Sequence, residues 1–126
     1  MLPNGTIGAG VLIIALSCLV RVFRTLWRDP DAEGRGPYLF AYGPAGGGDP
    51  YRFRIQRAGE GYRAYLLTSP DYRGRPDDLS TTHRLQGGQG LYVCWDRPIP
   101  SAREAERVAA LWTELTERYI LTGSRF

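Results

Sequence analysis

The chain has 126 residues, of which 43% are hydrophobic and 23% are charged, a composition that fits one folded domain and excludes a disordered chain. Its basic residues are all arginine, and the formal net charge is +3. The excess lies in Arg21, Arg24 and Arg28, because arginines and acidic residues are equal in number from residue 29 onward. Nucleic-acid binding requires a concentrated basic face, so we expect no nucleic-acid partner.

Cysteine and histidine are too few for a metal site or a disulfide framework. The two cysteines are Cys18 and Cys94, and the one histidine is His83. One histidine and one accessible cysteine fall short of a zinc ligand set, so we expect no metal, and no motif indicates a cofactor. Cys18 lies in an apolar run, and a bridge to Cys94 would cross environments. Both thiols are therefore expected to be reduced.

The first 20 residues contain no charged side chain. Residues 7–20 are apolar on every face, and a helix of about 20 residues spans a hydrocarbon core of roughly 30 Å. We predict a single-pass transmembrane helix that continues through residues 21–28, so that residues 1–28 form a membrane anchor. The alternatives are a buried core helix of a soluble protein and a helix that docks on a partner.

Basic and aromatic residues at the end of this segment fit a membrane interface. Arg21, Arg24 and Arg28 share one helical face by their spacing, and Trp27 lies beside them. We predict that these four residues contact the lipid headgroups. Because the arginine excess follows the apolar run, we also predict that the N-terminus lies outside the cell membrane and the C-terminal domain in the cytoplasm.

Residues 29–37 are rich in proline, glycine and charge, and they are predicted to be a tether to a domain over residues 38–126. Tyr51, Phe53 and Ile55 alternate with polar residues, which predicts a strand buried on one face. The other strands are short apolar runs between turn residues. The predicted strands, in chain order, cover residues 38–42, 51–57, 62–68, 83–86 and 91–95. In the last of them, Leu91, Val93 and Trp95 are expected on one face, and Tyr92 and Cys94 on the other.

The last predicted element is a helix. Ser101 and Glu104 form a capping-box pattern, and Gly123 supplies a C-terminal stop. Between them an apolar stripe follows at helical spacing, and we expect it to lie across the sheet; its members are Val108, Leu111, Trp112, Leu115 and Tyr119. The fold class is therefore α+β: a small antiparallel β-meander packed on one long C-terminal helix, preceded by the transmembrane helix.

Cys94 and His83 are the candidate catalytic residues. A cysteine becomes a nucleophile when a nearby cation, helix N-terminus or imidazole favours its thiolate. His83, Arg84, Arg97 and the amino end of the Ser101 helix are close enough in sequence for that role. The alternative is that Cys94 is a small buried side chain and His83 an ordinary surface or hydrogen-bonded residue.

The layout resembles that of ubiquitin-conjugating enzymes, especially their divergent bacterial members. A strand meander, a proline-rich loop, a histidine, a glycine-containing turn, a cysteine and a tryptophan-bearing helix follow in that order, and Cys94 comes eleven positions after His83. The resemblance implies that Cys94 accepts a ubiquitin-like C-terminus as a thioester, with His83 as its neighbour. Arg84 and Leu85 stand where that family has Pro and Asn, so the oxyanion-stabilising amide is not present.

Three functions remain open from the sequence. The first is a membrane-anchored cytosolic domain that carries an acyl group on Cys94. The second is a non-catalytic, membrane-tethered protein-interaction module, for which the eight tyrosines and three tryptophans are suited. The third is a small subunit of a membrane assembly. The expected partners are the lipid bilayer and another protein.

Overall fold

The structure is a computed structural model that describes residues 25–28 and 36–126. The predicted membrane span over residues 1–20 lies outside these residues, as do Arg21 and Arg24. Within the described ranges, no helix combines the length and apolarity needed to cross a bilayer.

The helix predicted to continue through residue 28 is wrong for its last four residues. Thr25–Arg28 form strand β1, which pairs antiparallel with the next strand. Threonine and tryptophan favour strands when a sheet edge is available for pairing, and this local preference prevails over the expected helical continuation. That Trp27 and Arg28 contact lipid remains a prediction.

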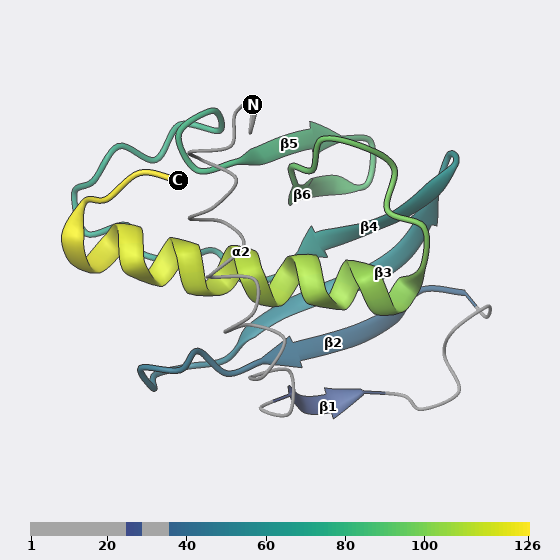
Figure 1. The fold of residues 1–126 in the computed structure, drawn as a ribbon, viewed down its shortest axis with the longest axis horizontal. Coiled ribbons are helices and arrows are strands. Elements are labelled where there is room, and N and C mark those ends of the chain that lie inside the picture. The colour runs from purple at the N-terminus through teal and green to yellow at the C-terminus, as the bar shows by residue number, and fades with distance from the viewer. Residues whose placement is uncertain (1–24, 29–35) are drawn as a thin grey trace, which may run out of the picture.

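Six strands form one antiparallel sheet in the order β1-β2-β3-β4-β6-β5. The prediction of an antiparallel sheet packed on one long C-terminal helix is confirmed (Figure 1), but the sheet is not a simple meander, because β6 lies between β4 and β5. The elements after β1 are β2 (Tyr38–Tyr42), β3 (Tyr51–Ala58), β4 (Gly61–Leu66), β5 (Arg84–Gly87), β6 (Gly90–Val93) and the helix α2 (Ala102–Thr122).

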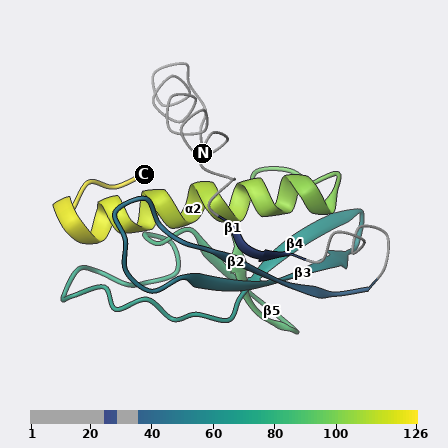
Figure 2. The same cartoon turned by 90° about the horizontal axis from the view of Figure 1, so that it is seen from below.

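Helix α2 lies on one face of the sheet, as the side view shows (Figure 2). Its N-terminus is capped by Ser101, whose hydroxyl accepts a hydrogen bond of 3.1 Å from the Glu104 amide. Its C-terminus ends at Gly123, whose φ of 77° is left-handed and whose amide donates to Tyr119. The serine half of the predicted capping box is thus present, while the Glu104 carboxylate pairs with Arg107.

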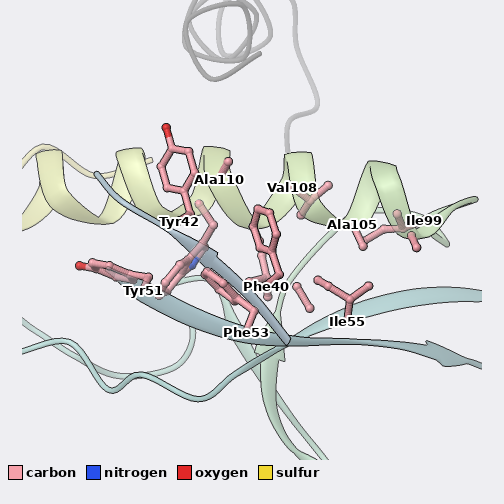
Figure 3. Close-up of a cluster of buried hydrophobic side chains, with 14 residues drawn as sticks. Phe40, Tyr42, Tyr51, Phe53, Ile55, Ile99, Ala105, Val108 and Ala110 are labelled. Atoms are coloured by element: carbon pink, nitrogen blue, oxygen red, sulfur yellow. The ribbon is translucent and has the colours of Figure 1, made fainter. Parts of the chain in front are cut away.

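The core lies between α2 and the inner face of the sheet. Phe40, Phe53 and Ile55 have no exposed surface and point from β2 and β3 toward the helix (Figure 3). The helix meets them mainly with alanines, which allow it to lie close to the sheet, and with Trp112, whose ring stands edge-on to Phe53. The predicted alternation of the 51–57 strand is confirmed.

Tyrosines of the sheet donate hydrogen bonds to glutamates along one flank of α2. Tyr38 donates to Glu106 at 2.6 Å, and Tyr42 donates to Glu114 at 2.7 Å. A third bond joins Tyr51 to Glu117 in the same sense. These contacts attach β2 and β3 to the helix with charge-assisted bonds, which are stronger than neutral ones.

Replacing Tyr42 by phenylalanine removes the hydroxyl that donates to Glu114 and keeps the buried ring. Because a hydrogen bond to a charged group contributes about 1.5–3 kcal/mol, we expect Tyr42→Phe to lower the free energy of unfolding by about 2 kcal/mol in urea denaturation. Tyr92→Phe is the matched control, since no hydrogen bond to the Tyr92 hydroxyl is found in the described part of the chain. Equal losses in the two variants would contradict this account of the helix docking.

Candidate functional site

The hairpin formed by β5 and β6 places the two candidate residues opposite each other. Its register pairs Arg84 with Val93 and Gly87 with Gly90. One step beyond this ladder, the amide of Cys94 donates to the carbonyl oxygen of His83 at 2.9 Å. The eleven-residue separation therefore follows from hairpin register, and the structure brings His83 and Cys94 together at the open end of the hairpin.

The turn before His83 is fixed from two sides. The indole Nε1 of Trp112, on α2, donates to the Thr82 carbonyl oxygen at 2.9 Å. At the start of the turn, the Asp78 carboxylate accepts from both the amide and the hydroxyl of Thr81, and these bonds lower the pKa of Asp78. His83 then has a φ of 53°, a left-handed conformation that is uncommon outside glycine.

The imidazole of His83 contacts the C-terminal segment. After α2 the chain turns back along the helix (Figure 1), and the main-chain carbonyl oxygen of Phe126 contacts Nε2 of His83. The two rings also stack, with centroids 4.6 Å apart and planes at 30°. Phe126 in turn meets Tyr119 of α2 edge-on. The histidine thus belongs to an aromatic cluster that closes one side of the site.

A pocket of about 140 Å³ opens at the Cys94 side chain. Three segments form its walls: the end of β6 with the residues that follow it, one flank of α2, and the C-terminal segment. Most of its surface is apolar. We call it the Cys94 pocket, and its lining residues are His83, Val93, Cys94, Trp95, Asp96, Val108, Leu111, Trp112, Leu115 and Phe126.

The thiol of Cys94 is half-buried and has no hydrogen-bonding partner among the described residues. The Arg84 guanidinium donates instead to the Thr82 hydroxyl at 2.8 Å and to the Asp77 carbonyl oxygen at 2.7 Å. Arg97 is an exposed residue paired with Asp96, and its hydrogen bond lowers the pKa of that carboxyl group. The thiol shares its pocket with residues from the middle of α2, away from the amino end of the helix, and no hydrogen bond joins it to His83, Arg84 or Arg97.

One part of the predicted strand near Cys94 is wrong. Strand β6 ends at Val93, so the expected alternation does not continue to Trp95. Tyr92 faces away from the helix, where its ring meets that of Tyr65. Cys94 and Trp95 both line the pocket beside Val93, because the chain leaves the sheet there.

Sequence reasoning missed two walls of this pocket. Phe126 carries no motif, and only the return of the chain after Gly123 brings it to His83. Val108, Leu111 and Leu115 were expected to lie across the sheet, and they do lie on its side of α2. The helical spacing did not indicate that this flank of α2 also lines a pocket together with the end of β6.

No family model, curated protein or solved structure matches this chain. The resemblance to ubiquitin-conjugating enzymes therefore remains a prediction, and the function is argued from the geometry of the chain itself.

Phe126 closes one side of the Cys94 pocket, so its removal should open the thiol to reagents. We expect Phe126→Ala, in a Cys18→Ser background, to speed maleimide labelling of Cys94 several-fold at neutral pH, since access is one determinant of thiol reactivity. Leu121→Ala is the control, because Leu121 is 78% exposed and lies outside the pocket. An unchanged labelling rate for Phe126→Ala would show that the ring does not cover the thiol.

Proposed function

We propose that the chain is a membrane-tethered protein-interaction module and that an apolar side chain of a partner protein binds in the Cys94 pocket. The observation that carries the proposal is an apolar pocket between one flank of α2 and the end of β6, where Cys94 is half-buried and Trp95 is exposed. Ligand pockets are predominantly apolar with a few polar groups at the rim, and Asp96 and His83 supply such groups here.

The size of the pocket suits one side chain. A cavity of roughly 150 Å³ holds a benzene molecule in an engineered protein core, and the Cys94 pocket measures about 140 Å³. A partner's phenylalanine, leucine or methionine therefore fits, whereas a folded element does not. We expect recognition through one anchoring side chain and contacts around it.

Trp95 is placed to provide those surrounding contacts. Its side chain lines the pocket and is 36% exposed. Tryptophan has a large apolar ring system, which is usually buried in the core or at an interface. Tryptophan is enriched among the residues that dominate binding energy at protein interfaces. A partner side chain inserted beside it would remove both apolar surfaces from water together.

The membrane tether in this proposal is supported by the sequence alone. The uncharged segment over residues 1–20, followed by Arg21, Arg24 and Arg28, is typical of a single span with a cytoplasmic C-terminal flank. On this arrangement the pocket faces the cytoplasm close to the bilayer, and the partner is a cytoplasmic protein or the cytoplasmic part of a membrane protein.

A second candidate function is acyl transfer through Cys94. What favours it is the position of His83 opposite Cys94, with both side chains lining one pocket. The Cys94 sulfur would take an acyl group from a donor thioester, and the donor thiol would leave with the proton. For His83 to accept that proton from Cys94, its Nε2 must first separate from the Phe126 carbonyl oxygen.

Two substitutions of Cys94 distinguish these functions. Cys94→Phe fills the pocket, and Cys94→Ala keeps it open while removing the sulfur. For the interaction module, we expect the full chain to co-purify its partner from membranes with Cys94→Ala and to lose it with Cys94→Phe, measured by quantitative mass spectrometry. The helix signal in circular dichroism confirms that both variants are folded.

The opposite pattern would contradict the module. An adduct on the unchanged chain that hydroxylamine releases, and that Cys94→Ala abolishes, would establish the acyl carrier. Partner recovery that is equal for Cys94→Phe and the unchanged chain would exclude the pocket as the binding site.

A further inference from the structure

The face of the sheet opposite α2 carries a row of arginines and aromatic rings. Register pairs Leu39 with Arg54, Arg54 with Tyr65, Tyr65 with Tyr92, and Tyr92 with Leu85. Directly opposed residues of antiparallel strands lie on one face, so these five side chains form one row across the sheet. No described helix covers this face (Figure 2).

The guanidinium groups in and beside this row are held in place by rings. Arg54 lies 4.9 Å above the ring of Tyr65, and Arg63 lies 4.1 Å above the ring of Tyr92. Hydrogen bonds fix them further: Arg54 donates to Gln56 at 2.9 Å, and Arg63 donates to the Tyr65 hydroxyl at 3.2 Å. Their cations are therefore oriented before any ligand arrives, which lowers the entropy cost of binding.

The strands that form this face differ from the rest of the domain in carrying no carboxylate. Strands β2 to β6 contain no acidic residue. Arg52, Arg54 and Arg63 form no ion pair with any carboxylate in residues 36–126. Arginines and acidic residues are equal in number beyond residue 28, so the total charge did not indicate that they lie in different places. Within residues 36–126 the acidic residues are in α2 and in loops, whereas these three arginines are in the sheet. We call Arg52, Arg54, Arg63, Tyr65 and Tyr92 the arginine face.

A groove opens at one end of the arginine face. Strands β4 and β6 pair only at Tyr65 and Tyr92. Further along β4, Tyr62 forms an isolated antiparallel bridge with Ile99, which follows β6 in the sequence. The intervening chain leaves the sheet and a groove of about 420 Å³ results. Arg63 and Tyr92 line it together with Leu85 and Trp95, which are 42% and 36% exposed, and Glu60 is a carboxylate on its wall.

We propose that the arginine face binds an acidic segment of a partner protein. Carboxylates of that segment accept hydrogen bonds from Arg52, Arg54 and Arg63, and an apolar side chain of the segment enters the groove between Leu85 and Trp95. Charge complementarity carries the assignment, because three cations without carboxylate partners share a face with no acid on its strands. Planar guanidinium groups match carboxylates in two-point geometry.

The same geometry disfavours a nucleic acid and a bilayer as the occupant. Single-stranded nucleic acids bind by stacking bases on open aromatic rings, but here Arg54 and Arg63 lie over the rings of Tyr65 and Tyr92. A bilayer surface contacts groups that protrude, whereas Arg54 and Arg63 are half-buried. A flexible peptide reaches into such a surface. The arginines of this site are separate from the proposed function, because none of them lines the Cys94 pocket, although Val93 and Trp95 line both that pocket and the groove.

The test measures binding of a synthetic peptide to the full chain in detergent micelles. The probe is a fluorescein-labelled peptide of alternating glutamate and serine with one central leucine, and its glutamine analogue is the uncharged control. We expect the glutamate peptide to bind by fluorescence anisotropy and the analogue not to bind. Binding should weaken about threefold in Arg52→Gln and about tenfold in Arg52→Gln/Arg63→Gln, since exposed and half-exposed charge pairs contribute modestly.

Arg118→Gln is the matched control, because it removes an exposed arginine from α2 and should leave the affinity unchanged. Within residues 36–126 the exposed Arg52 side chain makes no hydrogen bond, ion pair or ring contact, so Arg52→Gln tests the charge with little effect on packing. Equal affinity for the two peptides, or an unaltered affinity in the variants, would overturn the proposal. So would variant-sensitive binding of anionic phospholipid vesicles or single-stranded DNA in place of the peptide. Neither Arg52 nor Arg63 lines the Cys94 pocket, so an effect of their substitution on peptide binding is independent of whether the pocket binds a partner.

Discussion

The docking of α2 by tyrosine–glutamate hydrogen bonds determines what the rest of the domain exposes. Tyr38, Tyr42 and Tyr51 hold one flank of the helix over β2 and β3 through Glu106, Glu114 and Glu117. The opposite flank, with Val108, Leu111 and Leu115, then lies beside β6. Because β6 is short and ends at Val93, this flank is not fully covered, and the Cys94 pocket is the result. The position of the pocket is thus a consequence of the bonds on the other side of the helix.

The charge distribution follows from the same arrangement. The glutamates of α2 accept from tyrosine hydroxyls, so the bonds to the helix need no arginine from the sheet. Arg54 of β3 and Arg63 of β4 instead face the opposite side, where they stack on Tyr65 and Tyr92. The domain therefore has an apolar pocket beside the helix and a cationic surface across the sheet. A domain with two such surfaces is suited to binding two segments of one partner or one segment of each of two partners.

Much of the fold was predictable because the signals for it are local. The alternation around Phe53 and the cap at Ser101 depend on neighbours in sequence, and both predicted the correct elements. The end of β6 at Val93 was not predictable, since it depends on where β4 and β6 separate. The helix predicted through Arg28 failed for a similar reason, because the pairing of β1 with β2 is a contact between distant residues.

The sequence predicted which residues form the candidate site better than it predicted the contacts that determine their reactivity. The sequence singled out His83 and Cys94, and hairpin register brings them face to face. It did not indicate that the carbonyl oxygen of Phe126 would contact the His83 imidazole, or that the Arg84 guanidinium would donate to the Thr82 hydroxyl. Both contacts join residues that are far apart or lie in an irregular turn, where spacing predicts little. The arginine face was visible as an alternating pattern, but its stacking partners depend on strand order.

The ionisation of tyrosine tests the central contact most directly. Burial and the hydrogen bond to Glu117 raise the pKa of Tyr51 above its ordinary value. In the unfolded chain the phenol ionises near pH 10, so the folded state is favoured below that pH and loses stability above it. In an alkaline titration followed by absorbance and circular dichroism, we expect Tyr51 to ionise only as the helix signal is lost. We also expect Tyr51→Phe to make the loss of stability with rising pH shallower. Ionisation of all eight tyrosines near pH 10, with the helix signal intact, would contradict it.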